Sequence, residues 1–384
     1  MTELREQSTG TLEWLQVLRG FAALAVVLFH FKDPLAHSLP ALAQVLELGS
    51  TGVDIFFIVS GFIIYQSTRR SASQDAVAFL VRRVTRIVLP AWVAMSLMAL
   101  AKPPRLSDLS DLILGFLFVL PRSAPAPTYG YGFLIVAWTL TYELYFYAMF
   151  ALALALSRRA RCDRALSLLG LMLLPMVGLQ LWLGGFTVLA TGLPDWRSLA
   201  DLPGASLLGV AANPMLLEFL VGVGLAWIYA RLPARLPVAP TRGLALLLLG
   251  AGLSWFASFQ ARGVPVDHGF ALAGGPSLLV VLGILGLQLS TRGTAGGALQ
   301  NSAGRALMRM GDASYSLYLI HPVLRSLLIT AAVHAGLTVG AGLSVLGVFL
   351  SIALALPFHR WIELPSQRLG RQWARRWTVS GASE

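Results

Sequence analysis

The sequence has little charge and almost no cysteine. Only 12% of its 384 residues are Asp, Glu, Lys or Arg, about half the share of a typical soluble domain, whereas 56% are hydrophobic. A water-soluble fold cannot bury that much apolar surface. The one cysteine, Cys162, excludes an intramolecular disulfide and a cysteine-based metal cluster, and we assign no metal ligands.

Apolar blocks of about 20 residues, the length that crosses a bilayer as a helix, run through the chain. The short alternating segments of an outer-membrane barrel are missing from this pattern. We therefore predict an all-α integral membrane protein of ten transmembrane helices, with one short re-entrant or interfacial segment at Leu112 to Leu120. The ten predicted spans are Leu12 to Lys32, Gly49 to Ser67, Val81 to Ala101, Phe133 to Ser157, Ala165 to Gly184, Asn213 to Arg231, Gly243 to Gln260, His268 to Ser290, Ala313 to His334 and Leu337 to Phe358.

The net charge of +11 comes from arginines in the short loops between these blocks. They are not gathered on one soluble face, so membrane topology and anionic lipid explain them better than nucleic acid does. Counted on alternate sides of the ten spans, twenty-one Lys and Arg lie on one side and six on the other. Because cytoplasmic loops carry the excess, both termini should be cytoplasmic. We expect a cytoplasmic segment at 1–11, a transmembrane domain at 12–358, and a basic cytoplasmic tail at 359–384.

Ionisable residues inside the spans are costly in lipid, and their default explanation is function. Arg19 and His30 are 11 residues apart in the first span. That spacing is three helical turns, so they share one face about 16 Å apart. Arg19 should lie near the cytoplasmic end and His30 in the outer half.

Other ionisable residues fall into the same two layers. Asp54 and Glu218 should reach the depth of His30, Glu143 and His321 should lie nearer the midplane, and Arg325 is one turn beyond His321. On the inner side, Arg83 and Arg86 are one turn apart. For any single residue a structural role is the alternative, in which buried acids neutralise buried arginines. Two opposed layers instead indicate a bundle that moves a substrate or joins two substrates from opposite sides.

Six motifs containing these residues resemble, in order, those of the acyltransferase 3 family of membrane O-acyltransferases. The residues of these motifs are most similar to those of the subgroup that acetylates exopolysaccharides. The matching pieces are the Arg-x10-His signature from Arg19 to His30, Gly52-Val-Asp54 to Ser60-Gly61-Phe62, Arg83-Val-Thr-Arg86, Trp138-Thr-Leu-Thr-Tyr-Glu143, Tyr315-Ser316-Leu-Tyr318-Leu-Ile-His321-Pro322 and Glu363-Leu-Pro365.

The resemblance implies transfer of an acyl group, acetyl in the first instance, from acyl-CoA at the cytoplasmic side to a carbohydrate hydroxyl. His30 is the expected general base, because imidazole titrates near neutrality, and either Asp54 or Glu143 could orient it. Arg19, Arg83 and Arg86 are expected to hold the CoA phosphates, with lipid anchoring as the alternative for the last two. Acceptor-side or structural roles are left for Ser60, Glu218, Tyr315, Ser316, His321 and Arg325.

The expected partners are acetyl-CoA as co-substrate, a polysaccharide or its lipid-linked precursor, membrane lipids and polysaccharide-synthesis machinery. We expect no permanently bound cofactor and no nucleic acid, and a multi-pass location in a bacterial inner membrane. Two other classes stay open: a transporter or flippase of a lipid-linked saccharide with a His and carboxylate proton relay, and an assembly subunit of an export complex. The acceptor, the exact acyl group, direct transfer against an acyl-His intermediate, and the oligomeric state are left open.

Overall fold

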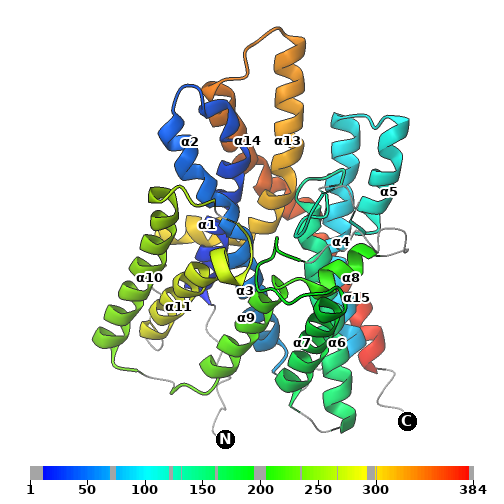
Figure 1. The fold of residues 1–384 in the computed structure, drawn as a ribbon, viewed down its shortest axis with the longest axis vertical. Coiled ribbons are helices and arrows are strands. Elements are labelled where there is room, and N and C mark those ends of the chain that lie inside the picture. The colour runs from blue at the N-terminus through cyan, green and yellow to red at the C-terminus, as the bar shows by residue number, and fades with distance from the viewer. Residues whose placement is uncertain are drawn as a thin grey trace, which may run out of the picture.

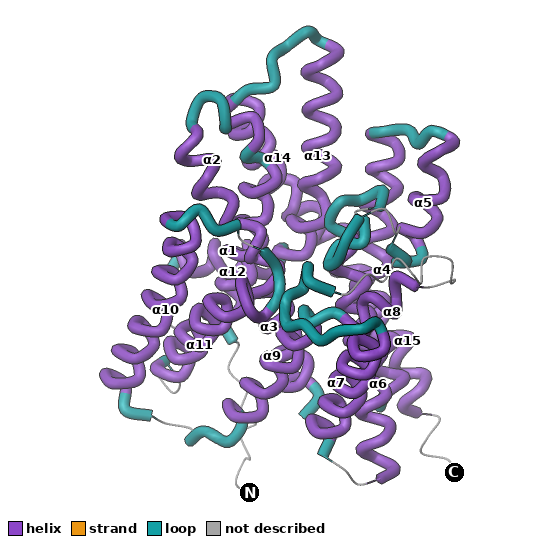
Figure 2. Tube along the Cα trace, viewed as in Figure 1, coloured by secondary structure: helices purple, strands orange, loops and turns teal. Residues whose placement is uncertain are grey.

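The computed structural model describes residues 12–69, 75–120, 124–130, 132–160, 163–193, 205–233, 236–265, 267–291, 299 and 301–379. Every regular element within these ranges is a helix (Figure 2). The predicted segment 1–11, the end of the predicted tail and Cys162 lie outside them. The all-helical membrane fold class is confirmed.

Nine helices in the described ranges are long and apolar enough to cross a membrane, or ten if one bent pair counts as a span. This agrees with the ten predicted spans. The long helices are α1 (Glu13–His30), α3 (Gly52–Ser67), α4 (Ala76–Ala101), α6 (Ala137–Ala160), α7 (Arg164–Trp182), α10 (Val238–Ala261), α11 (Gly275–Ser290), α13 (Ser314–His334) and α14 (Ala341–Phe358).

The shorter helices cap, extend or connect the long ones. Helix α5, at the predicted short segment, has only 8 residues and cannot span. These elements are η1 (Asp33–Leu35), α2 (Pro40–Leu46), η2 (Glu47–Thr51), η4 (Leu106–Asp108), α5 (Leu109–Phe116), α8 (Ala205–Ala212), α9 (Leu216–Tyr229), η6 (Phe270–Gly274), α12 (Ser302–Asp312), η7 (His359–Glu363) and α15 (Leu364–Val379).

The predicted span from Asn213 to Arg231 begins at a break between two helices. It contains α9, and α8 precedes it, with the pair bent by 47° at the break. Asn213 stabilises the break, because its side-chain amide donates to the Ala190 carbonyl and its side-chain oxygen accepts from the Met215 N–H. Pro214 has no N–H with which to continue a helix. The break places Glu218 in the first turn of α9.

Helix α4 begins five residues before the predicted start at Val81. The Asp75 carboxylate accepts a hydrogen bond from the Ala78 N–H, 2.7 Å away, and so caps the helix. Arg83 and Arg86 therefore lie two to three turns inside a helix. At the other end of the chain, the segment expected as a tail continues from α14 through η7 into α15, which packs along α4.

The helix ends alternate as the charge pattern predicts. Figure 1 shows the C-terminal ends of α6, α9 and α15 at the lower end of the molecule and that of α13 at the upper end. The upper end is the predicted outer side. Which end faces the cytoplasm stays a prediction.

Helices α3 and α9 make one of the closest contacts in the core. A Cβ built on Gly61 would lie 2.1 Å from the Phe219 carbonyl oxygen, and one on Gly222 would lie 2.0 Å from the Ile58 carbonyl oxygen. Neither position has room for a side chain. The two glycines thus let α3, which carries Asp54, approach α9, which carries Glu218.

Candidate active site

Helices α1, α3, α4, α6 and α13 enclose a cavity of about 90 Å³. It contains six of the residues predicted from the sequence, at positions up to 296 residues apart in the chain. They are Arg19, Ser60, Arg83, Arg86, Glu143 and Tyr315, and the remaining lining includes Phe56, Thr139, Tyr147 and Tyr318.

The arginine end of the cavity lies beside the C-terminal end of α3. Arg83 Nη2 donates to Ser67 Oγ at 2.8 Å, and Arg19 Nη1 donates to Gln16 Oε1 at 3.1 Å. Within the described ranges, no carboxylate lies at ion-pair distance from Arg19, Arg83 or Arg86. Guanidinium groups without a fixed counterion favour an anionic ligand.

Glu143 lies within the cavity and is hydrogen-bonded to its wall. Its Oε1 accepts from Ser60 Oγ at 3.2 Å and from the Tyr147 hydroxyl. These contacts fix the carboxylate among the arginines, where its negative charge offsets part of theirs. The predicted contact with His30 is not made.

His30 pairs with His321. Its Nδ1 lies 2.9 Å from the Val26 carbonyl oxygen and 3.1 Å from His321 Nε2, and the ring centroids are 4.9 Å apart. His321 Nδ1 lies 3.1 Å from the Leu317 carbonyl oxygen. One pair of tautomers satisfies all three contacts: each Nδ1 carries the hydrogen, and His321 Nε2 accepts.

That tautomer leaves the lone pair of His30 on Nε2. No residue in the described ranges hydrogen-bonds this atom. His321 is fully buried, whereas His30 is half-buried at the end of α1. His30 Nε2 is therefore the basic atom of the pair that a substrate can reach.

Tyr318 connects the cavity to the histidine pair. It lines the cavity, its hydroxyl lies 2.9 Å from Thr139 Oγ1, and its ring packs edge-on at 6.0 Å from the His321 ring. The arginines and the histidines thus lie toward opposite ends of one set of helices. Helix α3, which has 16 residues, is about 24 Å long, and this length approximates the separation of the two ends.

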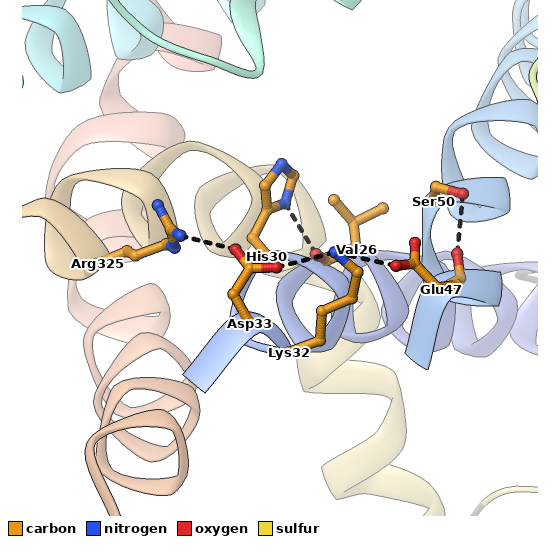
Figure 3. A network of polar contacts seen from close by, with 7 residues as sticks. All are labelled: Val26, His30, Lys32, Asp33, Glu47, Ser50 and Arg325. Atoms are coloured by element: carbon orange, nitrogen blue, oxygen red, sulfur yellow. Dashed lines mark hydrogen bonds and ion pairs between the residues drawn. The ribbon is translucent and has the colours of Figure 1, made fainter. Parts of the chain in front are cut away.

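A charged layer lies directly beyond the histidines. Arg325 Nη2 donates to Asp33 Oδ2 at 3.0 Å, and Lys32 bridges Asp33 and Glu47 (Figure 3). Asp33 follows His30 by three residues, and Arg325 follows His321 by four. The predicted position of Arg325 one turn beyond His321 is confirmed, and the pair gives α1 and α13 a second cross-link.

Two residues from the sixth and fifth motifs support the scaffold. Ser316 Oγ donates to Glu363 Oε2 at 2.6 Å, and His359 Nδ1 lies 2.8 Å from the same oxygen. Glu363 is fully buried within the π-helical turn η7. Of the two roles left open for Ser316, the structural one fits these contacts. Tyr315 also binds the scaffold, because its hydroxyl donates to the Ile87 carbonyl.

Asp54 contacts a residue that sequence reasoning missed. Its Oδ2 lies 2.9 Å from His268 Nδ1, and its Oδ1 accepts from the Gly269 N–H at 2.9 Å. The hypothesis that Asp54 or Glu143 orients His30 finds no supporting contact among the described residues. His268 is 214 positions from Asp54 and belongs to none of the six motifs. Only its place at the start of a predicted span hinted at a role.

Comparison with known proteins agrees with the motifs and the cavity. A family model described as an acyltransferase domain matches residues 12–360. The chain belongs to the acyltransferase 3 family. It is therefore an integral membrane O-acyltransferase, and this membership favours the predicted enzyme over the transporter and the export-complex subunit.

Two curated relatives carry the comparison further. The chain is 31% identical over 367 residues to the exopolysaccharide production protein ExoZ of Rhizobium meliloti (strain 1021), covering 92% of this chain and 98% of that protein. It is 32% identical over 155 residues to the acyltransferase MdmB of Streptomyces mycarofaciens, covering 37% of this chain and 39% of that protein. No solved structure matches the chain.

Proposed function

We propose that this membrane acyltransferase transfers an acetyl group from acetyl-CoA at the cytoplasmic side to a hydroxyl of an exported polysaccharide or its lipid-linked precursor. His30 is the general base. The observation that carries the proposal is a cavity whose three arginines have no ion-pair partner among the described residues. Tyr318 connects this cavity to His321 and so to His30, whose Nε2 has a free lone pair.

The donor fits the arginine end. CoA carries several phosphate charges that cannot enter the bilayer unaccompanied, and guanidinium binds phosphate through two parallel hydrogen bonds. Arg83 and Arg86 would hold the nucleotide near the inner end of α4, and Arg19 would meet the donor deeper in the cavity. The pantetheine arm would extend past Glu143 toward Tyr318, which brings the thioester toward His30.

The chemistry needs one proton transfer at the histidine pair. The acceptor hydroxyl gives its proton to His30 Nε2 as its oxygen attacks the thioester carbonyl carbon. The carbon–sulfur bond then breaks, and the CoA thiolate takes that proton from His30, which returns to its neutral form, so an alcohol and a thioester become an ester and a thiol. His321 would keep His30 in the Nδ1–H tautomer, the role that an acid has in a His and acid dyad.

The acceptor class rests on the relatives. ExoZ is named for exopolysaccharide production, and its similarity extends over nearly the whole of both chains. A polymer made for export would meet the enzyme from the outer side, where Asp33, Arg325 and Lys32 surround the approach to His30. Carbohydrate hydroxyls pair well with such charged groups. We further propose that the protein lies in a bacterial inner membrane with both of its termini in the cytoplasm.

The experiment that tests this function uses purified protein, acetyl-CoA labelled in the acetyl group, and a panel of glycans. We expect thioester cleavage that depends on the glycan, with label recovered in an alkali-labile ester. Thioester cleavage without formation of an ester would contradict the proposed reaction. So would the absence of cleavage with every glycan when the protein is folded. Movement of a lipid-linked saccharide in vesicles without acetyl-CoA would instead support the flippase hypothesis.

A further inference from the structure

A second histidine lies against a buried carboxylate away from the cavity. Asp54, in the first turn of α3, is fully buried, and the turn before α11 supplies both of its hydrogen bonds, from His268 and from the Gly269 N–H. Gly269 has a φ of +103°, a backbone conformation that residues other than glycine rarely adopt. The turn is thus shaped to place an imidazole and an N–H on one carboxylate.

A second carboxyl group lies beside the first. Glu218 in α9 is fully buried, and neither of its oxygens has a hydrogen-bond donor among the described residues. Its carboxyl group interacts with that of Asp54, and a Cβ built on Gly274 would lie 2.9 Å from its Oε1. Two ionised carboxylates side by side in an apolar core repel each other, whereas one shared proton turns the contact into a hydrogen bond.

A proton is the cation that suits this pair. Among the described residues, no group of three or more His, Cys, Asp or Glu side chains is arranged to hold a metal ion. The close contact at Gly61 and Gly222 holds together α3 and α9, the two helices that carry the acids. With one proton held between them, the pair keeps a single negative charge, and the neutral imidazole of His268 can donate a hydrogen bond to it from Nδ1.

His268 is the partly exposed member of the three. Its side chain is 17% exposed, against 0% for Asp54, and its Nε2 has no hydrogen-bond partner in the described ranges. Trp138 packs against its ring with centroids 5.4 Å apart. The other charged group facing it is Asp267, which accepts a hydrogen bond from Thr191. The π-helical turn η6 follows immediately, and such turns are frequent at functional sites.

We propose that Asp54, Glu218 and His268 form a proton-exchanging site, separate from the His30–His321 pair, in which the two carboxyl groups share one proton that His268 exchanges with solvent. Uptake is a relay through the ring. His268 Nε2 takes a proton from water, Nδ1 passes its own proton to Asp54, and Asp54 shares it with Glu218. One proton enters and the imidazole stays neutral. None of the three residues lines the arginine cavity.

The test is infrared spectroscopy of the full-length protein, which reads proton occupancy and needs no acyl transfer. We expect the wild type at neutral pH to show the carbonyl absorption of a protonated carboxylic acid, with a shift in D₂O. Glu218→Gln, which keeps the size of the side chain, should lose this band. The control Glu47→Gln removes an exposed carboxylate paired with Lys32 and should keep it.

A second variant tests the part played by His268. In His268→Asn the amide can still donate to Asp54 from near the Nδ1 position, but no titratable ring remains. We expect the band to persist while its exchange into D₂O slows by about 100-fold, the lower end of what a positioned acid–base group contributes.

Three results would overturn the site: no protonated-acid band in folded wild type, a band that survives Glu218→Gln, or unchanged exchange in His268→Asn. The wild-type measurement stands even where a variant fails to fold. If the protein has no acetyltransferase activity and still shows the band, the proposed function fails and the proton site remains.

Discussion

His321 Nε2 lies 3.1 Å from His30 Nδ1, so the imidazole on α1 is held by a second imidazole on α13. The ion pair between Asp33 and Arg325 adds a second link, from η1, three residues after His30, to the next turn of α13. Two cross-links fix the ring of His30 relative to α13, whose Tyr318 lines the cavity. Under the proposed function, His30 would exchange a proton with the substrate and His321 would position His30.

Replacing His30 should remove turnover without removing the protein from the membrane. In His30→Ala the group that takes the hydroxyl proton is lost, which typically costs about 10²-fold to 10⁴-fold in rate. Half-buried at the end of α1, the ring contributes little to packing in the core. Acetylation by purified variant in detergent measures the effect, with His334→Ala as the control because His334 is exposed and bonded only to Thr330. Near-normal turnover of His30→Ala would contradict the assignment of His30 as the general base.

Replacing His321 should have a smaller effect of a different kind. His321→Ala leaves the Val26 carbonyl as the one acceptor for His30 Nδ1, so the base survives with a looser orientation. Loss of one hydrogen bond of about 0.5 to 1.5 kcal/mol corresponds to a fall in kcat of roughly 2-fold to 13-fold. His321→Gln, whose amide oxygen can accept from Nδ1, should recover part of it. Donor affinity should stay unchanged, and a loss as large as that of His30→Ala would make His321 a catalytic residue.

The positions of helices were easier to predict than the contacts between them. Ten apolar blocks and the alternation of arginines predicted the spans, because length and charge act locally along the chain. The shared helix face of Arg83 and Arg86 followed from their spacing, but the cavity that joins them to Arg19 and Glu143, on two other helices, depends on packing. The pairing of His30 with His321 and of Asp54 with His268 joins residues 291 and 214 positions apart, and depends on how helices pack. Helix α8, which precedes the predicted start at Asn213, was missed because its 8 residues are too few to be read as a span.

The pair formed by Asp33 and Arg325 should act on the acceptor and not on the donor. It is exposed to solvent, so its contribution to stability is at most about 1 kcal/mol, and either variant should fold. In Arg325→Ala and Asp33→Asn we expect a higher KM for the glycan with unchanged acetyl-CoA binding. Arg262→Ala, which replaces an exposed arginine distant in sequence from His30 and His321, is the control. A change in donor affinity with no change in glycan KM would contradict this placement.

Arg83 and Arg86 should act on donor binding and not on the chemical step. Replacing either by Ala removes a charge-assisted hydrogen bond of about 1.5 to 3 kcal/mol, which corresponds to roughly 10-fold to 150-fold in affinity for acetyl-CoA. Lys should recover part of the loss, because it keeps the charge without the two-pronged geometry. Direct CoA binding to purified protein is the measurement, with Arg82→Ala as the matched control because Arg82 lies on the same turn but does not line the cavity. Normal affinity in a folded Arg83→Ala, Arg86→Ala double variant would return both residues to lipid anchoring.

The single cysteine allows the predicted sidedness to be tested directly. Cys162 lies in sequence between α6 and α7, on the predicted cytoplasmic side together with both termini and the 290–304 segment. A membrane-impermeant maleimide should therefore label it only after the membrane is opened. In a Cys162→Ser background, Leu337→Cys should react in intact cells, because Leu337 is exposed and belongs to the connection between α13 and α14, which lies at the upper end of the molecule in Figure 1. Labelling of both positions from the same side would mean that one of the ten spans does not cross. The arginine cavity would then no longer face cytoplasmic CoA, so this experiment also tests the premise on which the assignment of the donor depends.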